Sequence, residues 1–351
     1  MITFWQQIQG KLVNLEKNEL DPNLKTWVDA RCVTREDIAI LENEYKIDPD
    51  HILDILDPDE LSRIEDGDDY ILTITRLPIF VPAAEVSYFA IPLGIITTKD
   101  AIITICWTDC EVLKDFSNNR VKGINMNDFP SFLITILSRA AITYLRYLKE
   151  INRRAVSIQG ELQYAVENKE ILQLLNLEKS MLFFTTSLKS NQLLVEKFRR
   201  TKFFNLDEDD RDDLEDVAID NRQALEMADT YSSILSTMLD AFGNVISNNV
   251  NSVMKKLTVA TIVITVPTFI TSFYGMNIPL PFQEMGKWSI LIVTALCFLA
   301  VPITRFILRD KPIKSNDKKK AKPIGYKNKI AIKKIKKQLA QQEAALEEKE
   351  K

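Results

Sequence analysis

The sequence is poor in the residues that build most catalytic and metal centres. It has one histidine, His51, and four cysteines among 351 residues. Cys106 and Cys110 lie four positions apart, with no second pair of cysteines or histidines near them, which argues against a zinc cluster or a disulfide framework. No phosphate-binding loop, dinucleotide fingerprint or nucleophile elbow is present. We therefore expect no enzyme activity, and an enzyme on a membrane anchor is the weakest alternative.

Charge is missing from one stretch of an otherwise highly charged chain. Asp, Glu, Lys and Arg make up 27% of the sequence, yet none occurs from Leu257 to Gln283. A second apolar run, "WSILIVTALCFLAVPIT", extends from Trp288 to Thr304. Each run approaches the roughly 20 residues that span a hydrocarbon core of about 30 Å. We therefore predict transmembrane helices at 257–274 and 288–308, joined by a short outer loop at 275–287.

Basic residues flank both runs and set the expected orientation. Lys255 and Lys256 precede the first run, and arginines and lysines from Arg305 onward follow the second. By the positive-inside tendency, both chain termini are expected in the cytoplasm of a multi-pass protein of the inner or plasma membrane. The N-terminal segment has no apolar signal core, so we expect no cleavage or export of the large N-terminal part. A soluble protein that buries two hairpin helices is the alternative, which the bracketing lysines disfavour.

The rest of the chain divides into a mixed part and a helical part. "DYILTITRLPIF" places Tyr70, Leu72 and Ile74 on one face, and "AIITICW" has the dense apolar character of a buried strand. We predict a cytoplasmic α/β domain at 1–128. Helical spacing follows at 129–204, which predicts antiparallel helices.

A single long helix is predicted to lead into the membrane. The acidic run "NLDEDDRDD" suits the positive end of a helix dipole. From Asp213 to Thr265 the sequence has no proline and only one glycine, Gly243. We predict a stalk helix at 205–256 that continues into the first span, on the order of 90 Å long at 1.5 Å per residue. For the charged tail at 309–351 we predict no role beyond placing lysines near anionic lipid.

Hydroxyl groups gather on one face of the first predicted span. With residues placed at about 100° intervals, this face and its flanks contain Met254, Thr258, Thr261, Thr265, Thr268 and Ser272. Such hydroxyls can bond neighbouring helices or the helix's own carbonyls, or they can line a wet path. Hydroxyls alone favour packing. Extended backward, however, the face reaches Asp240 and Asp229, and identical helices around an axis would repeat Asp240 as a carboxylate ring that concentrates cations. Because two spans cannot enclose a pore, this interpretation requires an oligomer.

The first span ends in "SFYGMNIPLP". Pro267 lies on the side opposite the hydroxyls, where it removes a backbone hydrogen bond and can bend the helix. Gly275 is expected to end the helix by adopting backbone angles closed to other residues. Asn277 then presents an amide that can hydrogen-bond the waters of a hydrated cation, and Mg²⁺ is the biological divalent ion that dehydrates most reluctantly.

These features resemble the CorA family of magnesium transport proteins, over roughly residues 20 to 312. The motif that carries the resemblance is "YGMN" at the outer end of the first span, supported by "NSVMKKLTVATIV" and "DPDELSRIEDGDDYILTITRLP". The resemblance implies a funnel-shaped homopentamer with an α/β cytoplasmic domain, a long helical stalk that lines the pore and two C-terminal transmembrane helices. It implies passive, potential-driven influx of hydrated Mg²⁺, regulated by Mg²⁺ inside the cell, with membrane lipid and identical subunits as partners and no nucleic acid.

The resemblance also implies roles for individual residues. The selectivity filter would comprise Gly275, Met276 and Asn277. Together with the hydroxyl face, the resemblance implies that the pore is lined by Thr261, Thr265, Thr268, Ser272 and Asp240. An apolar gate would be formed by Met254 and Leu257. A regulatory Mg²⁺ site between subunits would pair Asp216 with Asp115, or with Glu111 in its place. Thr265 stands where the family often has a bulky apolar residue, so the gate here would be shorter.

Two alternatives stay open. Zn²⁺, Co²⁺ or Ni²⁺ could be the cargo on the same fold, because Asn277 coordinates no ion directly on this interpretation. A membrane-anchored helical scaffold, whose hydroxyl face serves only packing, would carry no ions at all.

Overall fold

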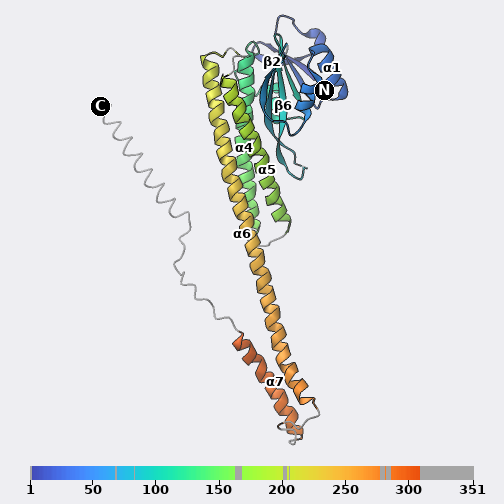
Figure 1. Cartoon of the computed structure of the whole chain (residues 1–351), viewed down its shortest axis with the longest axis vertical. Coiled ribbons are helices and arrows are strands. Elements are labelled where there is room, and N and C mark those ends of the chain that lie inside the picture. Colours follow the sequence, from blue (N-terminus) through green and yellow to red (C-terminus); the bar gives the residue numbers. More distant parts are fainter. Residues whose placement is uncertain are drawn as a thin grey trace, which may run out of the picture. The chain divides into compact units, whose positions relative to one another are not determined.

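In the computed structural model the chain forms two compact units, Met1–Val250 and Asn251–Lys351. The structure describes residues 2–67, 69–82, 84–162, 168–200, 204, 206–276, 281 and 286–308. The predicted filter residue Asn277, most of the predicted outer loop 275–287 and the predicted tail 309–351 lie outside these described residues. Figure 1 labels the main elements along the chain.

A seven-stranded mixed sheet forms the centre of the first unit. Its strands are β1 (Ile2–Ile8), β2 (Lys11–Leu15), β3 (Thr26–Arg31), β4 (Arg63–Asp66), β5 (Ile71–Phe80), β6 (Tyr88–Thr97) and β7 (Ala101–Cys106). They lie in the order β2-β1-β3-β7-β6-β5-β4. β3 and β7 are parallel, and the other neighbouring pairs are antiparallel. The strands predicted around "YILTITRLPIF" and "AIITICW" are β5 and β7.

Helices cover both faces of this sheet. α1 (Arg35–Tyr45) and α2 (Pro49–Leu56) share one core cluster with Leu72 and Ile74 of β5 and with Tyr70 just before it, so the predicted common face of these three residues is confirmed. Leu77 and Ile79 of the same strand belong to a second cluster, which includes residues of the longer helices. Side chains of a strand alternate between its two faces, so a strand covered on both sides is apolar nearly throughout.

Local signals in the sequence position α1 and α2. The Thr34 side chain and Asp37 form a capping box at the start of α1, and Asp48 caps α2 with Pro49 in its first turn. α2 also requires a glycine in the strand beneath it. A Cβ atom at Gly94 would lie 2.2 Å from the Cδ1 atom of Ile55, so a side chain there would displace the helix or force Ile55 to move.

Three long helices follow the sheet. They are α4 (Phe129–Leu162), α5 (Asn168–Arg200) and α6 (Glu208–Tyr274), preceded by the short α3 (Glu111–Ser117). α4 and α5 lie side by side against the sheet (Figure 1). Their aromatic residues Tyr144 and Phe184 share a core cluster with Ala224 and Ala228 of α6. The predicted long helix is confirmed, because α6 runs for 67 residues without interruption.

The second unit contains the end of α6 and α7 (Lys287–Ile307). Both helices include a stretch long and apolar enough to cross a membrane, and neither stretch is buried within the chain. A soluble protein with two buried apolar helices would enclose these stretches, so this alternative finds no support. The expected class, an N-terminal α/β domain with a long helix and two candidate C-terminal spans, matches the fold.

Candidate functional site

The hydroxyl face predicted for the first span is exposed. Its four residues in the apolar part of α6 are Thr261, Thr265, Thr268 and Ser272, and all are exposed. Each of the three threonine hydroxyls donates to the carbonyl oxygen four residues earlier, at 2.8 to 3.0 Å. This bond uses the hydroxyl's one proton and leaves lone pairs on its oxygen. The face is therefore a row of hydrogen-bond acceptors.

The opposite face of α6 packs against α7. In the span, the half-buried positions of α6 are Val259, Val263, Val266, Pro267, Ile270 and Tyr274. At about 100° per residue, these positions cluster on the side away from Thr265, so Pro267 lies where the sequence predicted. The Cys297 thiol of α7 donates to the Pro267 carbonyl oxygen at 3.9 Å. Packing between the chain's own two spans therefore does not account for the hydroxyl face.

The continuation of this face in the first unit is also exposed. Its members there are Asp229, Ser236, Asp240, Gly243, Ser247 and Val250, all exposed. α6 packs in that unit through other residues, including Leu214 and Ala224. In the second unit, the predicted gate residues Met254 and Leu257 are 55% and 59% exposed. The described part of the chain leaves these apolar side chains exposed.

The end of the first span differs from the prediction in one respect. α6 ends at Tyr274, and the Gly275 backbone N–H donates to the carbonyl oxygens of Thr271 at 3.0 Å and Ser272 at 3.2 Å. The prediction that Gly275 adopts backbone angles closed to other residues is wrong. Positive φ occurs at other glycines, such as Gly286 before α7, and not at Gly275. Ordinary turn bonds end the helix, and a Cβ at position 275 would lie 3.4 Å from the Ser272 carbonyl oxygen.

Of the three predicted filter residues, the structure describes two. Met276 follows Gly275 with its side chain 50% exposed. Asn277 lies outside the described residues, and so does Glu284, the only acid of the predicted outer loop. The assignment of the filter consequently rests on the sequence.

The two carboxylates predicted for regulation have different environments. Asp216 of α6 is exposed. Asp115 of α3 is 2% exposed, and its Oδ2 atom accepts a hydrogen bond from the Arg139 Nε atom at 2.8 Å. Its Oδ1 atom lies 3.6 Å from a terminal guanidinium nitrogen of Arg120. Within one chain, Asp115 is therefore held by arginines rather than presented to solvent.

The alternative partner, Glu111, is also engaged. It accepts hydrogen bonds from the Arg146 guanidinium and the Tyr147 hydroxyl, each at 2.7 Å. The bond from Arg146 lowers the pKa of the Glu111 carboxyl. A metal ion at either Asp115 or Glu111 would compete with arginine for the same oxygens.

Sequence reasoning missed a group of carboxylates at the start of α6. In the described residues, the group whose ligand atoms all lie within 4.8 Å of one another is Asp128, Asp207 and Asp210. The Asp210 N–H donates to Asp207 Oδ1 at 2.8 Å, so this pair also caps the helix, as expected for the acidic run. Burial, followed by the charge of Asp128, raises the pKa of Asp210. No sequence signal pointed to Asp128, which precedes α4.

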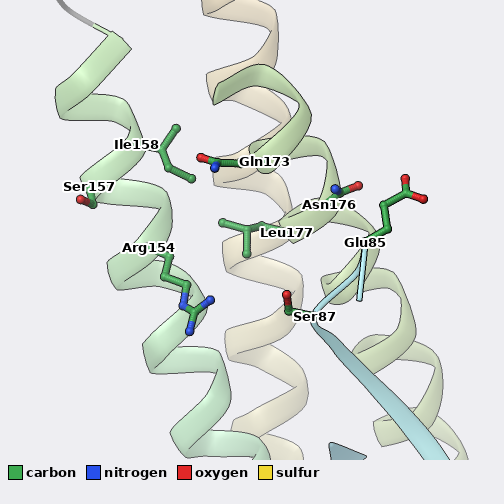
Figure 2. A pocket seen from close by; sticks show the side chains of 8 residues that line it. All are labelled: Glu85, Ser87, Arg154, Ser157, Ile158, Gln173, Asn176 and Leu177. Atoms are coloured by element: carbon green, nitrogen blue, oxygen red, sulfur yellow. The ribbon is translucent and has the colours of Figure 1, made fainter. Parts of the chain in front are cut away.

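A cavity of about 390 Å³ lies between α4 and α5, beside the connection from β5 to β6. Figure 2 shows Arg154 and Leu177 directed toward the space between the two helices. The Arg154 guanidinium donates to Glu150 at 2.7 Å and lies over the rings of Phe80 and Tyr88, at 5.0 and 5.1 Å from their centroids. These contacts fix the strand ends against α4, so Arg154 has a structural role here.

Comparison with known proteins matches most of the chain to one family. The model of the family described as CorA-like Mg²⁺ transporter protein matches residues 25–309. The cobalt/magnesium transport protein CorA of Methanocaldococcus jannaschii is 26% identical over 290 residues, which cover 81% of this chain and 89% of that protein. The protein of the same name from Thermotoga maritima is 21% identical over 280 residues, which cover 78% of this chain and 79% of that protein.

A solved structure agrees with this match at the level of the fold. The complete structure of the CorA magnesium transporter from Methanocaldococcus jannaschii superposes with a TM-score of 0.73 at 23% identity, covering 88% of this chain and 96% of that one. At this identity the likeness shows the fold alone. It includes the α/β domain, the long helix and the two C-terminal helices.

Proposed function

Because this chain belongs to the CorA-like Mg²⁺ transporter family, we propose that it conducts hydrated Mg²⁺ passively along the hydroxyl face of α6. As a family member it is a divalent-cation transporter of a membrane, and the family consists of transporters rather than enzymes. The observation that carries the proposal is that the hydroxyl face of α6 stays clear of α7. A polar face inside a membrane that is not used within the chain must meet water or another molecule.

The chemistry of this face suits a hydrated cation. Water bound to a cation directs its protons outward, and a row of acceptor oxygens at Thr261, Thr265 and Thr268 can receive them. Mg²⁺ keeps several of its waters when it binds to proteins, because it dehydrates reluctantly. In this proposal the ion is selected in hydrated form at the Asn277 amides, passes the hydroxyls and leaves past Asp240.

Transport on this path requires several copies of the chain. Two spans cannot enclose a pore, so identical subunits surround the axis with α6 innermost, and a homopentamer is the assembly that the family resemblance implies. In such a ring Met254 and Leu257, each exposed in one chain, meet their copies and form an apolar constriction. A hydrophobic constriction of this kind gates by dewetting. Asp240 repeats as a ring of carboxylates on the cytoplasmic side.

The driving force is the membrane potential. It contributes about 2.3 kcal/mol per charge per 100 mV, hence about 4.6 kcal/mol for a divalent cation. Influx into a cell with a negative interior therefore needs no nucleotide. Both termini lie in the cytoplasm on this proposal, consistent with the lysines and arginines at the basic ends of the two spans.

Cytoplasmic Mg²⁺ closes the pore by bridging subunits. A Mg²⁺ ion between Asp216 and a carboxylate of a neighbouring subunit offsets the repulsion between the two carboxylates and stabilises the closed arrangement. When Mg²⁺ is depleted, the subunits separate and the pore opens. Asp115 is the predicted partner, although Arg139 would have to release it or share it. Exposed Asp216 is the stronger half of this assignment.

Replacement of Asn277 tests the path. Asn277→Ala is expected to abolish Mg²⁺ uptake by liposomes that contain only this protein, while the oligomer stays intact by size-exclusion chromatography. Gln223→Ala, which removes an exposed amide from α6 at about 120° around the helix from the hydroxyl face, is the matched control and should leave uptake unchanged. Undiminished uptake in Asn277→Ala would exclude the filter assignment.

The rival cargo is another divalent ion. Both curated relatives carry cobalt as well as magnesium in their names, so Co²⁺ is the first competitor to test, followed by Ni²⁺ and Zn²⁺. Competition among these metals in the same uptake assay decides which ion the chain prefers. A helical scaffold, the rival from another class, predicts no flux of any of them.

A further inference from the structure

A groove in the second unit combines basic and apolar side chains. It has a volume of about 630 Å³ and lies between α6 and α7 at the end of the spans where basic residues gather. Its lining residues are Ser252, Lys255, Lys256, Val259, Ala260, Val263, Ile264, Val301, Arg305 and Leu308. The volume is within the range of pockets that hold small organic ligands. The groove lies on the face of α6 opposite the hydroxyls, so an occupant would not stand in the proposed ion path.

Among the described residues that line the groove, the charges have one sign. Lys256 and Arg305 contribute cations, and none of these described residues carries a carboxylate. Along the sequence, no Asp or Glu occurs between Asp240 and Glu284, or between Glu284 and Asp310. The groove therefore presents a positive end that favours an anionic group.

The remainder of the groove is apolar. Val259, Val263 and Val301 are half-buried and form an apolar surface along the two spans, with exposed Ile264 beside them. A free phosphate or another small anion would leave this surface unused. A ligand that matches both parts has an anionic head and a hydrocarbon chain, and a membrane around the spans supplies such molecules.

We propose that this groove is a binding site for an anionic phospholipid. The lipid phosphate lies between Lys256 and Arg305, and one acyl chain runs along Val259, Val263 and Val301. Basic pockets between transmembrane helices suit anionic headgroups, because basic residues near a membrane surface attract anionic lipid. A zwitterionic lipid offers the same acyl chains without net negative charge, so the groove discriminates by headgroup. This site is independent of ion transport.

Native mass spectrometry of the full-length oligomer released from detergent tests the proposal. The protein is mixed with equal amounts of phosphatidylglycerol and phosphatidylcholine, and the lipids that stay bound are counted. We expect preferential retention of phosphatidylglycerol. The double variant Lys256→Gln and Arg305→Gln should weaken that retention by more than about ten-fold, because each basic residue contributes roughly five-fold.

Variants with matched controls separate the two parts of the groove. Val263→Trp fills the apolar part and should release lipid without a change of charge, whereas Phe298→Trp alters a side chain that is 76% exposed elsewhere on α7 and should not. Lys256→Arg with Arg305→Lys keeps the charge and should keep the lipid. Lys11→Gln with Lys46→Gln removes two exposed cations from the first unit and should have no effect.

Three results would overturn the proposal. Equal retention of both lipids would exclude recognition of the anionic headgroup. Unchanged retention in Val263→Trp would place the lipid elsewhere on the protein. An oligomer that retains neither lipid would show that the groove holds no phospholipid in the assembled protein. Because the readout is bound lipid, each result is obtained whether or not the protein conducts Mg²⁺.

Discussion

Threonine hydroxyls whose hydrogens are already engaged in hydrogen bonds give α6 its distinctive chemistry. Thr261, Thr265 and Thr268 each bond a carbonyl one turn earlier, and their lone pairs face outward from the helix. Acceptors of this kind attract the protons of water around a cation without replacing its hydration shell. A carboxylate in the same position would bind the ion more strongly, and in the proposed path the nearest acid on this face is Asp240, on the cytoplasmic side. Weak contacts inside the membrane allow an ion to leave as readily as it enters.

Asp216 provides a prediction about regulation. Asp216→Ala is expected to shift the half-inhibitory concentration of Mg²⁺ inside liposomes upward by at least about ten-fold, the lower end of what loss of a supporting partner costs a metal site. Uptake is measured as a function of the Mg²⁺ concentration loaded inside. Asp213→Ala, an exposed acid one helical turn earlier, is the control and should leave the curve in place. Coincident curves for Asp216→Ala and the unmodified protein would move the sensor to other residues.

Asp210 provides a prediction about pH. Its side chain is 4% exposed, and burial, followed by the charge of Asp128, raises its pKa in the fold. A raised pKa means that ionised Asp210 disfavours folding at neutral pH, and that this cost disappears as pH falls below the unfolded value of about 3.9. Asp210→Asn should therefore raise the free energy of unfolding at pH 7 by less than about 1 kcal/mol, a size typical of single charge contacts.

Thermal unfolding of the full chain at several pH values measures this effect. The gain from Asp210→Asn should shrink as pH is lowered from 7 to 4. Asp209→Asn changes the exposed neighbouring acid and should show no such trend. A gain for Asp210→Asn that stays constant with pH would mean that the charge of Asp210 is not its cause.

At the scale of elements, α6 is a helix with two unlike faces in the membrane. One face carries hydroxyls and is exposed, and the other carries Val263 and Ile270 and packs toward α7. Thiol labelling can distinguish these faces. With exposed Cys32 and half-buried Cys297 replaced by serine, and the buried Cys106 and Cys110 retained, single cysteines are introduced along the span.

Cysteine in place of Thr265 or Thr268 should react with a charged, membrane-impermeant thiol reagent and lose most Mg²⁺ uptake, because the adduct stands in the ion path. Cysteine at Val263 or Ile270 should leave uptake nearly unchanged under the same treatment. Equal inhibition at all four positions would contradict the assignment of the hydroxyl face to the path.

Elements with strong local patterns could be predicted from the sequence, and contacts between distant segments could not. The unbroken course of α6 and the apolar character of β7 follow from residues close together in the chain. Gly94 is different, because a side chain at this position would collide with Ile55 of α2, a residue distant in the sequence. Asp128 likewise joins Asp207 and Asp210 only through the fold. The acidic run predicted that Asp207 and Asp210 lie at the start of a helix, and nothing in the sequence predicted Asp128 as their third partner.

The prediction about Gly275 failed for a related reason. A glycine after a helix often marks left-handed backbone angles, but the sequence alone does not show which of several turn geometries the chain adopts. Here the bonds to Thr271 and Ser272 close the helix without that conformation. Because the predicted filter residue Asn277 is only two residues away, this turn sets where the chain leaves the helix on its way to the filter.

At the scale of the whole molecule, the proposed pore requires more than one copy of the chain. Its candidate spans are not buried within the chain, and large apolar side chains such as Phe298 and Phe306 are 76% and 75% exposed. Lipid around α7 and further copies around the hydroxyl face of α6 are the surroundings that the proposed pore requires. The formal net charge of the chain is −4, while the ends of the spans are basic, as expected for a protein that sits on an anionic leaflet.

The most direct test of the proposed transport is ion uptake by liposomes that contain only the purified chain. An inside-negative potential is imposed without any nucleotide, and Mg²⁺ influx is monitored with an internal dye. We predict rapid Mg²⁺ uptake that rises with the imposed potential and ceases when the potential is collapsed at equal Mg²⁺ on both sides. Liposomes that take up no more Mg²⁺ than protein-free ones, at any potential and with their interior free of Mg²⁺, would contradict the proposal that this chain conducts Mg²⁺.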